Sequence, residues 1–372
     1  MIAALRRAYN AFRGVAPPER IVPAMDGPLR PNTLLDAAAT VLRLAGVDNL
    51  VATADGVLCT SGRELLSLDW SGTTAAARPL ESFGHPISCL AADGAGGLAV
   101  GQDGRGVLLH GGPHDGLVIE RAGAMRLGCP TAALFLDPDT LIVANGSTAG
   151  PAADWKRDLM AQRRTGSVWR IDLRRPEAAV MLAGGLAFPA GLASAGGGAV
   201  LVSEAWRHRV VRLADGSAPA EVLGDLPAYP GAIVAAAQGG FWLALFAPRN
   251  QLVEFVLGER RYCERMMERI HPDHWIAPAL SGGASFLEPI QGGARKKLNT
   301  LKPWSPSWSY GLVVRCDARC KPTASFHSRA DGHVHGVTAL CERDGRLLAA
   351  ARGSGRVVSL DPQPDPDLGG SA

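Results

Sequence analysis

Charged and aromatic residues are both scarce in this sequence. Of its 372 residues, 20% are charged and 6% are aromatic, and the formal net charge is +3. A nucleic-acid-binding domain normally carries clustered basic residues, and many RNA-binding domains add exposed aromatic side chains. Neither pattern occurs, so nucleic acid is not expected as a partner. No apolar run approaches the ~20 residues of a membrane helix, so a membrane-spanning segment is not expected either.

The sequence also lacks the cysteine pattern of a disulfide framework. Its seven cysteines are odd in number and irregularly spaced, whereas such frameworks use paired cysteines. Only Cys316 and Cys320 lie close together, and no further Cys or His stands at the spacing of a zinc site. We expect free thiols in a reducing compartment, which favours a cytoplasmic location.

Long amphipathic helices between apolar strands are missing, which argues against a parallel α/β fold. The sequence contains instead 45 glycines and 26 prolines, typical of many tight turns. Residues 188–246 repeat one pattern twice: a short apolar strand, a glycine turn, a second apolar strand, a polar turn and a third, alternating strand. Glycine turns between such runs indicate β-hairpins.

Similar units recur along most of the chain, at a pitch of roughly 40 residues. They cover residues 48–69, 86–110, 130–173, two units within 188–246, and 336–360, with residues 310–316 expected to complete the fifth. Six such units predict an all-β fold, a six-bladed β-propeller formed by residues 46–361. A closed ring also removes the exposed edges of an open sheet.

The segments outside the repeats are expected to be helical or irregular. Residues 1–45 are predicted to be a helical extension and connector, with helix near 34–44, and 362–372 a flexible tail. The first 16 residues form a short basic amphipathic pattern, which we expect to dock on the propeller; membrane-surface binding is the alternative. No apolar core of signal-peptide length follows, so secretion is not expected.

Two insertions interrupt the repeats, at residues 146–165 and 249–309. Residues 152–160 and 253–270 have helical patterns, whereas 282–308 is rich in Gly, Pro and Lys and is predicted to be loop. Long loops in a compact domain are usually functional or disordered. A lid over one mouth of the ring is the functional interpretation.

Over residues 130–361 the chain resembles the strictosidine-synthase-like family of six-bladed propellers, the branch that includes adipocyte plasma-membrane-associated protein. Paraoxonases and gluconolactonases are more distantly similar. The resemblance covers more than half the chain in the right order and rests on these segments: Trp155-Lys-Arg-Asp-Leu, Thr165-Gly-Ser-Val-Trp-Arg-Ile-Asp, Phe188-Pro-Ala-Gly-Leu, Val202-Ser-Glu-Ala-Trp-Arg-His-Arg, Leu226-Pro-Ala-Tyr-Pro, Gly240-Phe-Trp-Leu-Ala-Leu, Tyr310-Gly-Leu-Val-Val-Arg and Glu342-Arg-Asp-Gly-Arg-Leu.

The resemblance implies two kinds of active site, and the sequence departs from both. Hydrolytic relatives hold a calcium ion in the channel with carboxylate and amide oxygens, but of the matching positions only Asp48 keeps a carboxylate. The others fall at Pro130 or Thr131, at Ala190 and at Gly231-Ala232. We therefore expect neither metal nor cofactor. Strictosidine synthase uses a glutamate in the last blade, where this chain has Thr338.

Three residues are candidates for acid–base chemistry at the channel. His85 stands in His85-Pro-Ile-Ser, which resembles a paraoxonase motif, and a neutral imidazole is a competent general base. Packing before a proline is the alternative role. Asp48 could orient that base or simply cap a turn. Glu204 is a surviving acid, although its spacing from His208 also suits a structural pair joining strands.

Further candidates lie beside the expected channel. His335 is a possible catalytic group and His333 a substrate-binding one, since alternation places both on one side of a strand start; an exposed loop pair is the alternative. Trp206 and Trp242 could form an aromatic wall or pack in the core. Asn145 is a further candidate for substrate binding.

Three functions remain open from the sequence. The first is a metal-independent esterase or lactonase that acts on a small molecule, with His85 as base. The second is a condensing enzyme of the Pictet–Spengler type, with Glu204 or His335 replacing the lost glutamate. The third is a propeller that binds a ligand without catalysis. Panels of esters and lactones, and of amines with aldehydes, would separate them.

We predict that calcium does not stabilise this protein. An ion that binds only the folded state must raise the melting temperature by mass action. With Ala190 and Ala232 at two ligand positions, the melting temperature should be the same in millimolar calcium and in chelator. A rise with calcium that chelator reverses would contradict this expectation.

Overall fold

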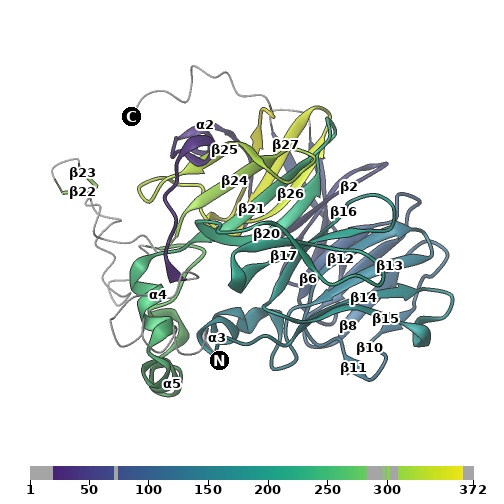
Figure 1. The fold of residues 1–372 in the computed structure, drawn as a ribbon. Helices are drawn as coiled ribbons and strands as arrows, with labels where there is room; N and C mark the ends of the chain where they lie inside the picture. The colour runs from purple at the N-terminus through teal and green to yellow at the C-terminus, as the bar shows by residue number, and fades with distance from the viewer. Residues whose placement is uncertain (1–19, 71–73, 283–295, 298–299, 302–308, 363–372) are drawn as a thin grey trace.

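The protein is a six-bladed β-propeller in the computed structural model, which describes residues 20–70, 74–282, 296–297, 300–301 and 309–362 (Figure 1). Six four-stranded antiparallel sheets follow one another along the chain. Each innermost strand contacts the innermost strands of both neighbouring sheets, and the last, β26, contacts the first, β2. The sheets therefore close into a ring, as the repeat pattern predicts.

The first three sheets hold twelve strands, in spatial order from the innermost strand outwards. Their bounds are β2 (Val47–Thr53), β3 (Gly56–Ser61), β4 (Glu64–Trp70) and β5 (Ala75–Ser82); β6 (Ile87–Ala92), β7 (Leu98–Gln102), β8 (Gly106–His110) and β9 (Val118–Ile119); and β12 (Pro130–Asp137), β13 (Thr140–Asn145), β14 (Gly166–Asp172) and β15 (Val180–Leu186). A small hairpin, β10 (Arg121–Ala122) and β11 (Met125–Arg126), lies between the second and third sheets in sequence.

The remaining three sheets are built in the same way. Their bounds are β16 (Pro189–Ser194), β17 (Val200–Glu204), β18 (Arg209–Leu213) and β19 (Ala220–Leu223); β20 (Ala228–Ala235), β21 (Phe241–Pro248), β24 (Gly311–Cys316) and β25 (Pro322–Ser328); and β26 (Val337–Arg343), β27 (Arg346–Ala351), β28 (Arg356–Leu360) and β1 (Ala39–Arg43). The fifth sheet takes β24 from beyond the long insertion, as expected for residues 310–316. That insertion also contains β22 (Lys296–Lys297) and β23 (Thr300–Leu301).

The sixth sheet is completed by a strand that the sequence analysis assigned to the connector. Helix was expected near 34–44, but α2 covers only Leu34–Ala37, and β1 then pairs with β28, with Ala39 opposite Ser359. The short strand buries only Val41, so it carries little periodic signal. Its edge pairing joins the start of the described chain to its end and leaves the sixth sheet with four strands like the others.

Apolar side chains fill the spaces between neighbouring sheets. One cluster joins the first and sixth sheets through Val47, Cys59 and Leu348, and another joins the second and third through Val107 and Val143. All five side chains are fully buried. Each buried aliphatic side chain contributes about 1.5–3 kcal/mol. The alternating apolar residues of each strand therefore hold each sheet against its neighbours.

A hydrogen bond crosses every junction between neighbouring sheets near the starts of the innermost strands. These six bonds are Ile87 N to Gly62 O (2.8 Å), Ser88 Oγ to Pro130 O (2.6 Å), Thr131 Oγ1 to Pro189 O (2.6 Å), Ser203 Oγ to Gly231 O (2.6 Å), Gly336 N to Tyr310 O (3.0 Å) and Thr338 Oγ1 to Asp48 Oδ1 (2.7 Å). Each such bond adds about 0.5–1.5 kcal/mol to stability. Together they fix how the sheets meet at this end, which we call the mouth of the ring.

Helices from the two insertions pack together beside the third, fourth and fifth sheets. They are η3 (Ala152–Asp154) and α3 (Trp155–Met160), as the helical pattern of 152–160 predicts, and α4 (Gln251–Gly258), α5 (Arg260–Arg269) and η6 (Pro272–His274). In Figure 1, α4 and α5 lie outside the sheets. Leu159 of α3 and Met266 of α5 share one buried cluster with Tyr229 of the fifth sheet.

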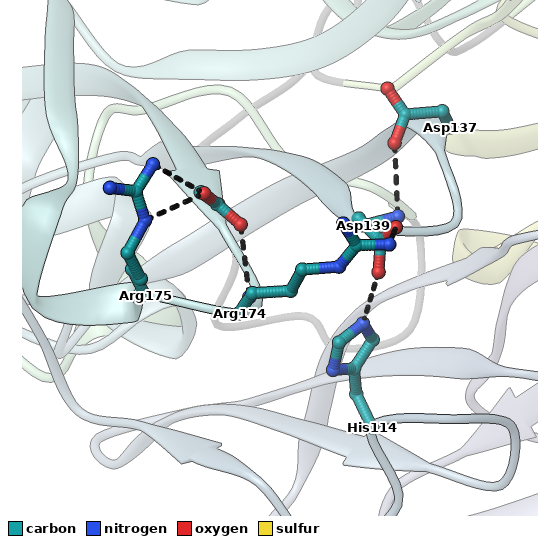
Figure 2. A network of polar contacts seen from close by, with 6 residues as sticks. His114, Asp137, Asp139, Arg174 and Arg175 are labelled. Carbon is teal, nitrogen blue, oxygen red and sulfur yellow. Dashed lines mark hydrogen bonds and ion pairs between the residues drawn. The ribbon is translucent and has the colours of Figure 1, made fainter.

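Charged side chains link the second and third sheets at the end opposite the mouth. The ring of His114 contacts Asp139 at 2.8 Å, and Arg174 also binds Asp139 (Figure 2). Beside them Asp172 accepts the backbone N–H of Arg174 at 3.0 Å. That hydrogen bond lowers the pKa of Asp172. The side chain of Arg174 is 72% exposed, and exposed ion pairs contribute little stability. His114 and Asp139 are partly buried.

Within the described residues, no helix is long and apolar enough to cross a membrane. The expected amphipathic helix of residues 1–16 and nearly all of the tail at 362–372 lie outside those residues.

We predict that Leu35→Ala weakens the closure of the ring. Leu35 of α2 is fully buried in the cluster that joins the fifth and sixth sheets. Removing such a side chain leaves a cavity, and the free energy of unfolding should fall by about 2–5 kcal/mol. Denaturant unfolding measures this change. Ile21→Ala is the control, because Ile21 is exposed; equal effects of the two changes would contradict the prediction.

Candidate active site

The candidate site is the central channel of the propeller. The innermost strands enclose a cavity of about 490 Å³, within the usual range for small-molecule sites. From Asp48 to Ala52 the wall follows four steps of β2, roughly 13 Å at 3.3 Å per residue. Most lining residues are Ala, Val, Leu or Phe. The channel therefore suits a compact, largely apolar molecule.

Polar groups of the lining gather at the mouth around Asp48. Its Oδ1 accepts hydrogen bonds from the Thr338 hydroxyl (2.7 Å) and the Asn49 backbone (3.0 Å). Its Oδ2 accepts from Nη1 of Arg352 (3.0 Å). The Asp48 side chain is 14% exposed and that of Arg352 is 50% exposed. The mouth thus holds a carboxylate and a guanidinium in direct contact, both within reach of a ligand.

Three aromatic side chains form a wall of the cavity near the mouth. They are Trp155 of α3, Phe188 before β16, and Phe246 of β21. Trp206 lies behind them: its ring stacks on Phe188 at 4.6 Å between centroids, and its Nε1 donates to Asp158 at 2.8 Å. Trp206 therefore supports the aromatic wall from behind. It is not itself among the lining residues.

The long insertion reaches the cavity through Leu280. Its carbonyl lies where a side chain on Gly336 or Gly353 would stand, 2.6 Å and 1.9 Å from the Cβ that those positions lack. Leu280 also lines the cavity. Glycine at these two positions lets the insertion approach the mouth closely, so the described part of residues 249–309 borders the channel as a lid would.

At the opposite end the lining includes one carboxylate, Glu342. Its Oε2 accepts hydrogen bonds from Nε1 of Trp242 (2.9 Å) and the backbone N–H of Ala237 (3.0 Å). Trp242 itself is buried and packs on Phe326. It belongs to the core and lies outside the lining, so its expected place in an aromatic wall of the channel is not found.

The residues at the mouth do not fit a calcium ion. Calcium takes six to eight oxygen ligands, including several carboxylates. Here Asp48 is already paired with Arg352, and Ala190 and Ala232 line the matching positions without donor side chains. In the described part of the chain, no group of three His, Cys, Asp or Glu is placed to hold a metal. The positive charge that faces Asp48 at the mouth is therefore the guanidinium of Arg352.

Glu204 lies away from the cavity in a structural network. Its side chain is fully buried, Oε1 accepts the backbone N–H of Ala187 (2.7 Å), and Oε2 accepts Nε of Arg209 (2.6 Å). Arg209 also contacts Glu221 (2.9 Å). These contacts connect β17, β18 and β19 with the segment before β16, so Glu204 has a structural role. Its partner is Arg209 and not His208, whose ring lies 3.9 Å from Glu254.

The two C-terminal histidines do not share one surface. His335 is buried, its Nε2 donates to the carbonyl of Arg329 (2.8 Å), and its Nδ1 contacts the Ser309 hydroxyl (3.0 Å). Burial lowers its pKa. His333 is exposed and contacts Asp36 (3.2 Å). Neither histidine is among the lining residues. The expectation that both face the channel from one side is therefore wrong.

His85 and Asn145 also stand outside the lining. His85 is half-buried in the bend between β5 and β6, three residues before Ser88, which does line the mouth. Its role as a base stays a prediction. Asn145 is fully buried; its Oδ1 accepts from Cys129 N (2.9 Å) and its Nδ2 donates to Ser147 O (2.9 Å). Its amide is thus used within the fold.

The lining includes residues that were not proposed as site residues from the sequence, among them Trp155, Phe188, Phe246 and Arg352. Trp155 was expected only as part of a helix, and Phe188 only as part of a repeat. Arg352 follows β27 in a short turn, η8 (Arg352–Ser354), where a basic residue normally points to solvent. Cys89 also lines the cavity, but burial raises the pKa of its thiol to about 12, so it is not a nucleophile near neutral pH.

Several buried histidines make the fold sensitive to acid. Burial lowers the pKa of His327 to about 4 and that of His208 well below its usual value. Below pH 6.5 these histidines take up protons in the unfolded chain but not in the folded chain. Their contribution to the free energy of unfolding is therefore fully present above pH 6.5 and is lost as the pH falls toward 4. For His327 alone this loss is about 3 kcal/mol.

We predict that His327→Gln flattens the decline of unfolding free energy between pH 6.5 and 4. The glutamine does not titrate, so the share of that decline due to His327 disappears. Denaturant unfolding at a series of pH values measures the slope. His271→Gln is the matched control, because the side chain of His271 is 70% exposed. An unchanged slope in His327→Gln would refute the assignment.

Solved structures with the same fold include gluconolactonases. A gluconolactonase from Xanthomonas campestris has 13% sequence identity and a TM-score of 0.54, with 91% of this chain and 96% of that chain covered. A protein assigned as a gluconolactonase has 13% identity and a TM-score of 0.52, with 87% and 91% covered. The calcium-binding protein regucalcin from Agrobacterium tumefaciens has 12% identity and a TM-score of 0.49, with 88% and 95% covered. No protein-family profile and no curated protein sequence matches the chain. The chain thus has the six-bladed propeller fold of gluconolactonase structures.

Proposed function

We propose that this protein is a hydrolase of small, largely apolar esters or lactones, which acts in the central channel without a metal ion. The observation that carries the proposal is the mouth, where the Asp48 carboxylate and the Arg352 guanidinium meet at 3.0 Å beside an apolar cavity of about 490 Å³. Hydrolysis needs a base for water and a positive group near the carbonyl oxygen. The gluconolactonase fold supports the same class of reaction by analogy alone.

The proposed reaction uses the two charged groups at the mouth. Asp48 takes a proton from water as the water oxygen bonds to the acyl carbon. The guanidinium of Arg352 stabilises the negative charge that develops on the carbonyl oxygen. The acyl C–O bond then breaks, and the proton passes from Asp48 to the departing alkoxide. The apolar wall of Trp155, Phe188 and Phe246 holds the rest of the substrate and excludes water.

Two alternatives are less well supported. Pictet–Spengler-type condensation relied on Glu204 or His335, and both are engaged in buried contacts outside the lining. Ligand binding without catalysis has one observation in its favour: both oxygens of Asp48 already accept hydrogen bonds, which reduces its strength as a base. Activity measurements decide between binding and hydrolysis.

We expect the wild-type protein to hydrolyse members of a panel of aryl esters and γ-lactones, and Asp48→Asn to lose activity. Loss of a general base typically costs a hundredfold or more in rate. Asp55→Asn is the matched control, because Asp55 is exposed and outside the lining. Circular dichroism and the melting temperature establish that each variant is folded.

His85→Gln tests the sequence-based base in the same assay. We expect it to keep most activity, since His85 is not among the lining residues. A large loss in His85→Gln with full activity in Asp48→Asn would move the base to His85. Silence of the wild type on every ester and lactone would contradict the hydrolase proposal.

A further inference from the structure

We infer that Arg352 is a ligand-anchoring residue, and that the channel binds amphipathic monocarboxylic acids with the carboxylate at the mouth and the apolar part inside. As a statement about products this rests on the proposed hydrolase function, because ester and lactone hydrolysis yields such acids. As a statement about binding it depends only on the residues of the channel.

Arg352 has unused hydrogen-bonding capacity. A guanidinium has five N–H donors in a planar fork that matches a carboxylate. Among the described residues, only Nη1 of Arg352 has a partner, Oδ2 of Asp48 at 3.0 Å. Nε and Nη2 remain available on a side chain that is half-exposed at the cavity mouth. An incoming carboxylate can therefore bind Arg352 in the plane of the fork.

Charge is distributed unevenly along the channel. Three charged residues line it: Asp48 and Arg352 at the mouth and Glu342 at the far end. In the part of the lining that the structure describes, Arg352 is thus the sole cation. Two hydrogen bonds hold the Glu342 carboxylate at the far end. Its negative charge repels a second negative group from that end. Charge alone therefore orients an acid with its carboxylate toward Arg352.

Asp48 can share its partner, Arg352, with a ligand. When Arg352 turns toward a ligand, Oδ1 of Asp48 keeps the hydrogen bonds from Thr338 (2.7 Å) and the Asn49 backbone (3.0 Å). The carboxylate is therefore not left unpaired, which is the main cost of breaking a partly buried ion pair. Asp48 still competes with the ligand for the guanidinium. Removing the Asp48 charge should therefore strengthen the binding of an acid.

The apolar part of the ligand follows from the lining. Beyond the mouth the wall consists mostly of aliphatic side chains of the innermost strands, together with Trp155, Phe188 and Phe246. Such a wall gains free energy from burying carbon and offers few hydrogen-bond partners. The expected ligands are aryl-alkanoic or medium-chain acids; sugars, which need many hydrogen bonds, are not expected.

The test compares an acid with its alcohol on the intact protein. Isothermal titration calorimetry with 4-phenylbutyrate and 4-phenylbutanol gives both affinities without any turnover. Wild type should bind the acid at least about tenfold more tightly, since a charged hydrogen-bonded contact supplies that difference. Arg352→Gln should abolish the preference and leave alcohol binding unchanged. Arg63→Gln is the control, because Arg63 is exposed in the turn between β3 and β4, on the mouth face, and outside the lining.

Asp48→Asn provides a second variant with an opposite expectation. It should bind 4-phenylbutyrate more tightly than wild type, although the proposed function predicts that it loses turnover. Equal affinity for acid and alcohol in the wild type, an unchanged preference in folded Arg352→Gln, or weaker acid binding in Asp48→Asn would overturn the inference. Acid preference in a protein that hydrolyses no ester would instead refute the proposed function and leave the anchoring role of Arg352 intact.

Discussion

The close approach of six innermost strands around one axis is the constraint on which this structure depends. At the fourth and fifth sheets a side chain on Gly191 would meet the carbonyl of Gly231 at 2.3 Å, so this junction requires glycine. The hydroxyls of Ser88, Thr131 and Thr338 then bridge neighbouring sheets at the same end. Small residues and short hydroxyl side chains leave a cavity on the axis. The channel is therefore a direct result of how the ring closes.

Charge at the mouth is balanced within the chain. The guanidinium of Arg352, from the neighbouring sheet, contacts the Asp48 carboxylate at 3.0 Å. A guanidinium differs from a metal ion in that it is attached covalently to the chain and offers directed N–H donors. The same side chain can thus neutralise Asp48 and also bind the anionic group of a ligand.

The sequence predicts the fold better than the site. Repeated apolar strands and glycine turns are local signals, so the six sheets follow from them, including β24 beyond the long insertion. Strand β1 was missed because it buries only Val41 and pairs with residues more than 300 positions away. Glu204 and His335 seemed functional because their partners, the Arg209 side chain and the Arg329 carbonyl, cannot be identified from sequence. Arg352 was not identified from the sequence, because its turn lies beside Asp48 only in the folded protein.

The pairing of β1 with β28 has a consequence for the order of folding. As the chain is synthesised, β1 is made first, and its partner β28 appears only after the other five sheets. Loops that long close slowly, and an unpaired strand can meanwhile pair with other chains. A strand of five residues with one buried side chain is a weak template for such pairing. The same sparse pattern that hides β1 in the sequence thus protects the growing chain until the ring can close.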